Sequence, residues 1–342
     1  MSAETAAPAP RVSMARGGPA LRFGLGIVFA LLIGHIIDMP LAFLAPVFAV
    51  GLLLPAPAPP DPRKLIAVPI VVGVVAVLVD AIGGFLAPMS DVLVLVFALV
   101  LFVCFHADAL RGPGPVVGLV LTVTLIVGTL AANAEPIAGQ IVQSMVLAAL
   151  SASLATIIAY AIVPHTGGGA AAEPVENDAA PSPRPVMTAV ARTVIALPII
   201  IWFIGHDVVG SFFVLVVAIN LLRLEMPERG ALVMILSNVI GGIVALLCAV
   251  LMEANPSPLF AVLLFLGVAI VLGLELEKGG VRAALAQGAT STAIILLALA
   301  IAPIDETGKT MDRVVLVFAT VVYVLLARAL FERSSRLGQV PG

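Results

Sequence analysis

The sequence predicts an all-α integral membrane protein of about 12 transmembrane helices, arranged as two parallel six-helix repeats. Three observations predict this fold: a composition too apolar for a soluble domain, a series of long apolar segments, and motifs that return in register half a chain later. Hydrophobic residues make up 61% of the 342 residues and charged residues 11%, against roughly 45–50% and about 25% in soluble domains. A soluble globular fold is therefore excluded.

Apolar segments of membrane-spanning length account for most of the chain. A spanning helix needs about 20 mostly apolar residues, because the hydrocarbon layer is about 30 Å thick and each helical residue rises about 1.5 Å. The segments lack the alternation of barrel strands, so helices are the expected spanning structure. They are predicted at 21–37, 40–54, 65–86, 91–107, 115–133, 137–163, 191–206, 209–224, 230–252, 257–274, 283–303 and 313–330.

The two halves repeat motifs that contain ionisable residues. The repeated pairs are Ile33-Gly34-His35 with Ile204-Gly205-His206, Ala76 to Ala81 with Ala249 to Ala254, and Asp108 to Arg111 with Glu275 to Lys278. Six helices per repeat is an even number, so the second repeat starts on the same side of the membrane as the first. In transporters built from two such units the substrate path lies where the units meet. Transport is therefore the leading functional hypothesis.

The distribution of positive charge predicts the orientation. With the N-terminus in the cytoplasm, all of the 17 Lys and Arg residues except Lys309 and Arg313 fall on the cytoplasmic side, as the positive-inside rule requires. Both termini are thus predicted to be cytoplasmic. The expected organisation is a disordered tail (1–20), a first six-helix repeat (21–165), a flexible linker (166–190), a second six-helix repeat (191–330) and a second tail (331–342).

Two histidines are candidates for proton coupling. His35 and His206 occupy the outer ends of the first helix of each repeat, with Asp38 and Asp207 close by. A histidine exchanges protons near pH 6.5, and a neighbouring carboxylate raises that pKa. The alternative interpretation is a pair of solvated turn residues at the level of the lipid headgroups.

Two carboxylates are further proton-coupling candidates. Asp80 and Glu253 lie toward the outer ends of the third helix of each repeat, after apolar residues. An ionisable group in a membrane segment is a functional candidate by default. Solvated carboxylates at helix ends are the equally weighted alternative.

Arg22, Arg192, Asn220 and Asn238 are the candidates for anion binding. Each arginine opens the first helix of its repeat, where it can attract an organic anion from the cytoplasm, although the positive-inside rule alone also places it there. The asparagines carry side chains that are costly to leave unpaired. They are predicted either to line the path or to form hydrogen bonds between helices.

The other charged and reactive residues do not form a pattern that predicts catalysis or metal binding. Asp108 with Arg111 and Glu275 with Lys278 are spaced i, i+3, as in surface ion pairs of little energetic weight. The histidines lack metal-ligand spacing, the two cysteines lie in predicted helices, and no phosphate-binding loop occurs. No enzymatic activity, metal, cofactor or nucleic-acid partner is expected.

One stretch of the first half resembles a known family. Leu21-Arg22 opens a short helix, a tight turn follows at Asp38-Met-Pro40, and Phe43-Leu-Ala-Pro46-Val-Phe-Ala-Val precedes a proline-rich loop. This arrangement resembles the fusaric acid resistance and aromatic acid exporter superfamily of bacterial inner-membrane proteins. The resemblance implies export of aromatic or other small organic acids, often with a periplasmic adaptor of the membrane-fusion type. Many members carry a large cytoplasmic domain after the first bundle, whereas here the linker spans only 166–190.

The resulting expectation is a multi-pass inner-membrane exporter of a small organic acid, driven by the proton gradient. A passive organic-anion channel of the same architecture is the nearest alternative, and a non-transporting subunit of a larger assembly is the second. The major facilitator superfamily is disfavoured, because its Gly- and Arg-rich loop between the second and third helices is replaced by a proline-rich segment, 55–64. Substrate, coupling ion and oligomeric state remain open at this point.

Overall fold

The computed structural model describes residues 17–54, 60–112, 114–133, 135–164, 184–205 and 228–301, with short helical pieces at 218–219, 222–223, 316, 319–320, 322–324 and 326–327. The helices run in the order α1 (Gly18–Ile36), α2 (Leu44–Leu53), α3 (Pro62–Leu86), α4 (Ser90–Arg111), α5 (Pro115–Asn133), α6 (Glu135–Ile162), α7 (Pro185–Gly205), α9 (Glu228–Ala254), α10 (Pro258–Leu276) and α11 (Gly280–Ala300). No strand occurs within these ranges.

The described helices have the length and surface of membrane helices. Eight of them are long and apolar enough to cross a bilayer. On α3 the side chains of Ile66, Ile70, Val74 and Val77 are exposed along one face, a contiguous apolar surface that a soluble monomer rarely shows. The protein is thus an all-α, multi-pass membrane protein.

Local signals in the sequence account for the ends of several helices. Proline follows the capping residue of α3 and of α10, where its missing N–H costs nothing. Asp61 accepts a hydrogen bond from the Arg63 amide at 2.9 Å, and Ser257 accepts one from Phe260 at 3.3 Å. The turn between α1 and α2 places Asp38 in the left-handed region, with φ of 48°, a conformation that aspartate tolerates better than most residues.

Two differences from the predicted segments have physical reasons. α7 begins at Pro185 rather than at residue 191, so it includes the end of the predicted linker; proline is favoured in a first helical turn. α2 covers only Leu44–Leu53 of the predicted 40–54. Pro46 lies in its first turn, where its missing N–H removes no internal hydrogen bond, so the helix needs no kink at this residue. The predicted segments 209–224 and 313–330 lie mostly outside the described residues.

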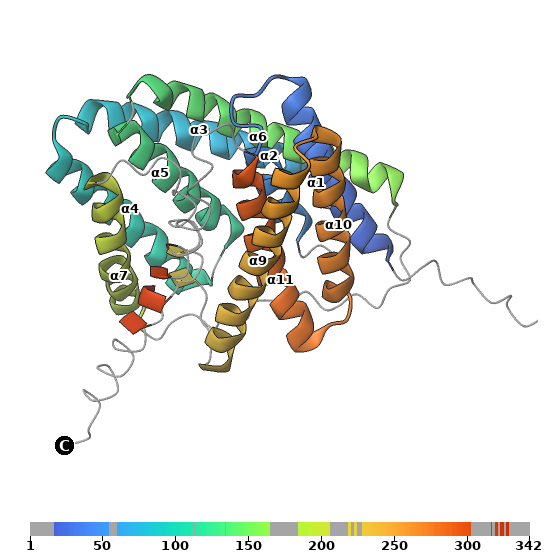
Figure 1. Ribbon diagram of the computed structural model, residues 1–342. Coiled ribbons are helices and arrows are strands. Elements are labelled where there is room, and N and C mark those ends of the chain that lie inside the picture. The colour runs from blue at the N-terminus through green and yellow to red at the C-terminus, as the bar shows by residue number, and fades with distance from the viewer. Residues whose placement is uncertain are drawn as a thin grey trace, which may run out of the picture.

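Helices far apart in the sequence pack together in the bundle. α1 packs against α2, α6 and α10, α4 packs against α7, and α9 packs against α11. Figure 1 shows α1 beside α10 at one side of the molecule and α4 beside α7 at the other. One buried apolar cluster joins α1, α2 and α6 with residues of α10 and α11. A second joins α4, α5 and α7 with Ala218, Ile219, Leu222 and Val324. The first and last parts of the chain therefore share both cores.

Small residues allow these close approaches. A Cβ on Gly273 of α10 would lie 3.0 Å from the Ala20 Cβ of α1, and one on Gly24 of α1 would lie 3.0 Å from Ile270 of α10. Glycine and alanine at such contacts let helix backbones approach closely, which is how helices associate in lipid.

Candidate functional site

The described proton-coupling candidates lie in three separate places. His35 is exposed at the end of α1, Asp80 is half-buried near the end of α3, and Glu253 is exposed near the end of α9. None of the described hydrogen bonds or ion pairs joins these three side chains to one another. His206 lies outside the described residues, as does its neighbour Asp207. The structure thus leaves open both interpretations of these residues, proton relay and solvated helix end.

The two arginines that open the first helix of each predicted repeat are both buried. Arg22 is 4% exposed, and its guanidinium carbon lies 4.2 Å from the ring centroid of Tyr160 on α6. This is a cation–π contact between α1 and α6. Arg192 is also buried, on α7. Any anion that these arginines bind must enter the helix bundle to reach them.

Asn238 forms a hydrogen bond between helices. The Thr292 hydroxyl on α11 donates to Asn238 Oδ1 on α9 at 2.6 Å, which corresponds to the interhelical use of such groups in membranes. The contact lies in a close α9–α11 interface, where a Cβ on Gly241 would lie 2.5 Å from the Ala289 carbonyl oxygen. Asn220 lies outside the described residues.

A group of hydrogen bonds joins Asp108, near the end of α4, to Arg223 and Gly114. Arg223 Nε donates to Asp108 Oδ2 at 2.6 Å, and Nη2 donates to Asp108 Oδ1 at 3.3 Å. Nη2 also donates to the Gly114 carbonyl at 2.5 Å, while the Gly114 amide donates to Asp108 Oδ1 at 3.2 Å. The expectation of a surface pair between Asp108 and Arg111 is therefore wrong. Asp108 points into the bundle, where Arg223 and the start of α5 surround its carboxylate.

Burial makes this ion pair different from an ordinary surface pair. The Asp108 side chain is 0% exposed and the Arg223 side chain 10%. The two residues are 115 positions apart, so sequence spacing gave no sign of the contact. Gly118 at the start of α5 leaves room for the arginine, because a Cβ there would lie 1.9 Å from Arg223 Nη1.

The matching end of α10 also reaches a distant part of the chain. The Glu277 carboxylate accepts hydrogen bonds from the Gly17 amide at 3.1 Å and the Ala20 amide at 3.0 Å, at the start of α1. A carboxylate is favoured there because the first amides of a helix lack internal partners. Glu275 and Lys278 form the predicted i, i+3 ion pair, which is partly exposed.

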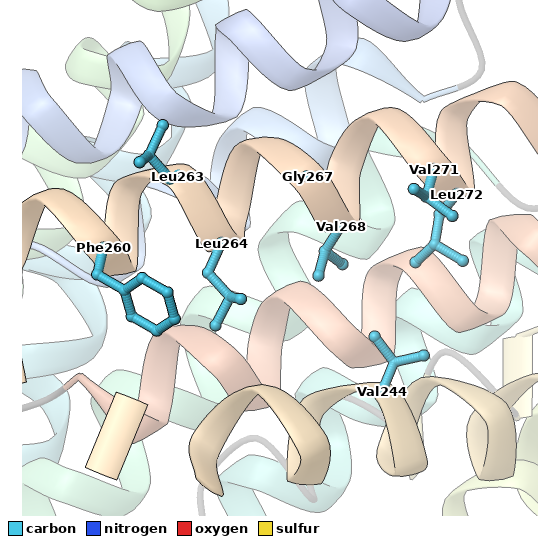
Figure 2. A pocket seen from close by; sticks show the side chains of 8 residues that line it. All are labelled: Val244, Phe260, Leu263, Leu264, Gly267, Val268, Val271 and Leu272. Carbon is cyan, nitrogen blue, oxygen red and sulfur yellow. The ribbon is translucent and has the colours of Figure 1, made fainter. Parts of the chain in front are cut away.

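An apolar groove of about 410 Å³ lies between α9 and α10. Figure 2 shows Leu264 and Val268 pointing from α10 toward Val244 on α9. All eight lining residues are apolar, so the groove offers no group that orients a polar substrate. Within the described ranges no three His, Cys, Asp or Glu side chains cluster as metal ligands do.

Comparison with known families gives a match over the first part of the chain. A family model described as "Protein of unknown function (DUF2955)" matches residues 19–163. Neither a curated protein nor a solved structure matches the chain. The match starts at the beginning of α1 and stops directly after α6, so the chain is similar to this uncharacterised family over α1 to α6.

Proposed function

We propose that the protein is an exporter of small organic acids of the aromatic carboxylic class, built from two parallel six-helix repeats with twelve spanning helices. The proposal rests on the packing of helices from one predicted repeat against helices of the other. α1 of the first packs against α10 of the second, and α4 of the first packs against α7 of the second. Transporters built from two similar units move substrate where the units meet.

Two polar contacts support the same arrangement. Asp108 at the end of α4 is bonded to Arg223, and Glu277 at the end of α10 is bonded to the start of α1. Asp108 of the first predicted repeat thus binds the second, and Glu277 of the second binds the start of α1, the helix that opens the first. The family match over residues 19–163 agrees with a structural unit that ends after α6.

The orientation and the energy source are part of the proposal. The positive-inside rule supports a bacterial inner-membrane protein with both termini in the cytoplasm. Proton coupling is assigned to Asp80 and Glu253, with His35 and His206, because matching ionisable residues recur near the ends of membrane segments in both repeats. A periplasmic adaptor is the partner that the family resemblance implies.

Efflux from liposomes tests this function. We would measure release of labelled benzoate from proteoliposomes with an imposed pH gradient, comparing the wild type with the double variant Asp80→Asn/Glu253→Gln. Gradient-dependent release should fall at least about tenfold in the variant, since neither amide side chain titrates. The matched control is Asp91→Asn/Glu275→Gln, which removes two other carboxylates and should leave release unchanged.

The alternatives predict different results in the same assay. Release that follows the membrane voltage and ignores the double variant would identify a passive anion channel. No release of any acid tested, from correctly inserted protein, would favour a non-transporting subunit of a larger assembly.

A further inference from the structure

We propose that Arg223 and the start of α5 form the site that binds the carboxylate of the exported acid, and that Asp108 occupies this site when no acid is bound. The inference rests on the function proposed above and names a binding residue for it. Asp108 then acts as an internal competitor that the substrate must displace.

The donors around Asp108 are those that bind free carboxylates in proteins. Arg223 Nε and Nη2 donate to the two carboxylate oxygens, at 2.6 Å and 3.3 Å, and the Gly114 amide adds a third donor at 3.2 Å. Gly114 lies directly before α5, a helix of 19 residues, and helix starts favour anions. Guanidinium groups bind carboxylates with two parallel hydrogen bonds. These donors can bind any carboxylate that fits between them.

Burial explains why this site needs an occupant at all times. The Arg223 side chain is 10% exposed, and a buried charge without a partner is strongly unfavourable. A buried pair, by contrast, adds little net stability over apolar packing. A substrate carboxylate can therefore replace Asp108, because the charge of Arg223 then stays neutralised during the exchange.

Arg223 is held by contacts that do not involve Asp108. Nη2 donates to the Gly114 carbonyl at 2.5 Å, and the guanidinium lies against the bare backbone at Gly118, where a Cβ would lie 1.9 Å from Nη1. These contacts keep the guanidinium in position during an exchange of carboxylates. Gly118 is needed because any larger residue would displace it.

The surroundings indicate where Asp108 goes and what kind of acid binds. Arg111 is exposed one turn after Asp108 on α4, and its i, i+3 position makes it an alternative partner for the displaced carboxylate. Phe105, Leu121 and Leu222 belong to one buried apolar cluster, each within a turn of the residues that form the site. Such surroundings favour a monocarboxylate with an apolar body over a dicarboxylate.

Equilibrium binding of labelled benzoate to the purified full-length protein in nanodiscs tests the site without any transport step. Asp108→Asn keeps the shape of the side chain and removes its negative charge. We expect benzoate to bind this variant at least about tenfold more tightly than the wild type, because tethered competitors act at millimolar or higher effective concentration. Glu275→Gln, at the matching position of the repeated motif, should bind benzoate as the wild type does.

Two further variants complete the test. Asp108→Asn/Arg223→Gln removes both buried charges, so it leaves neither one unpaired, and it should lose benzoate binding. Arg111→Gln is an exposed change that leaves the buried pair intact, and it should weaken binding about two- to fivefold, the range of a surface ion pair. Its result is informative even if Asp108→Asn does not fold.

Several outcomes would overturn the site. The first is folded Asp108→Asn protein that binds benzoate no more tightly than the wild type. The second is a double variant, Asp108→Asn/Arg223→Gln, that binds benzoate as well as Asp108→Asn does. The third is that no variant binds benzoate. If the variants bind benzoate as expected but the protein transports no acid, the binding site is supported and export is refuted.

Discussion

At the scale of single residues, a hydroxyl group compensates for a proline inside a membrane helix. Pro69 in α3 has no N–H, so the Leu65 carbonyl four residues earlier loses its helical donor. The Ser153 hydroxyl of α6 donates to this carbonyl at 2.9 Å. In α7, Tyr323 donates to the Ile195 carbonyl at 3.3 Å, but the carbonyl that lacks a donor because of Pro198 is that of Val194, so this bond does not replace the missing one. The donor to the Leu65 carbonyl lies 88 residues away in the sequence, so it becomes evident only in the structure.

Ser153→Ala should destabilise the protein by about 1 kcal/mol, because it leaves the Leu65 carbonyl without a donor in an apolar environment. Pro69→Ala restores the N–H that this carbonyl lacks. The loss caused by Ser153→Ala should therefore be smaller in the Pro69→Ala background. Unfolding in mixed micelles, followed by the signal of Trp202, measures all four proteins, and equal losses in both backgrounds would contradict the compensation.

The charged residues show which single-residue interpretations the sequence supported. Asp108 was recognised as an acid at a helix end, but its partner Arg223 lies 115 residues away, and i, i+3 spacing favoured Arg111 instead. Glu275 and Lys278 have the same spacing and do form that pair. Local spacing identifies a local pair only where no distant partner competes.

At the scale of helices, apolar length predicted the elements well and their contacts poorly. The predicted 65–86 ends at the same residue as α3, and the predicted 115–133 coincides with α5. Burial within the bundle follows from contacts between distant helices, which hydropathy does not encode. The interface of α9 and α11 is an example, since it depends on which glycine of an adjacent pair faces the neighbouring helix.

Gly241 and Gly242 provide a matched test of that interface. A Cβ on Gly241 would lie 2.5 Å from the Ala289 carbonyl oxygen, whereas one on Gly242 would meet nothing within 4 Å. Gly241→Ala should destabilise the protein by about 1–3 kcal/mol through overpacking. Gly242→Ala should be neutral or stabilising, because alanine favours helix over glycine by about 1 kcal/mol. Thermal unfolding of the two variants in detergent distinguishes the sites, and equal effects would rule out the close approach.

At the scale of the whole molecule, the sequence repeats predict two related units, and the structure shows which helices of these two predicted units lie together. α1 with α10 and α4 with α7 are contacts between the first and the fourth predicted helix of opposite repeats. Internal similarity alone does not determine such pairings. They follow from where glycine and alanine let backbones meet, as at Ala20 and Gly273.

Cysteine cross-linking tests the pairing of α1 with α10. With Cys104 and Cys248 replaced by alanine and a protease site placed within 166–183, Ala20→Cys/Gly273→Cys should form a disulfide that keeps the two fragments together on a non-reducing gel. The Cβ positions are 3.0 Å apart, close to the usual disulfide range of about 3.5–4.5 Å. Ala20→Cys/Gly267→Cys is the control and should not cross-link, because nothing lies within 4 Å of a Cβ at Gly267.

The hydrogen bonds that close over long sequence intervals have a consequence for synthesis of the protein. The Leu65 carbonyl is paired only after Ser153 is made, 88 residues later, and α7 gains the Tyr323 hydrogen bond at Ile195 only 128 residues later. The amides at the start of α1 wait for Glu277, about 260 residues later. While the chain is being synthesised and inserted into a bilayer, some backbone groups of the early helices therefore lack these hydrogen-bond partners until the later segments arrive. A chain truncated before Ser153 keeps the Leu65 carbonyl unpaired, with the free-energy cost that an unsatisfied backbone group carries in an apolar environment.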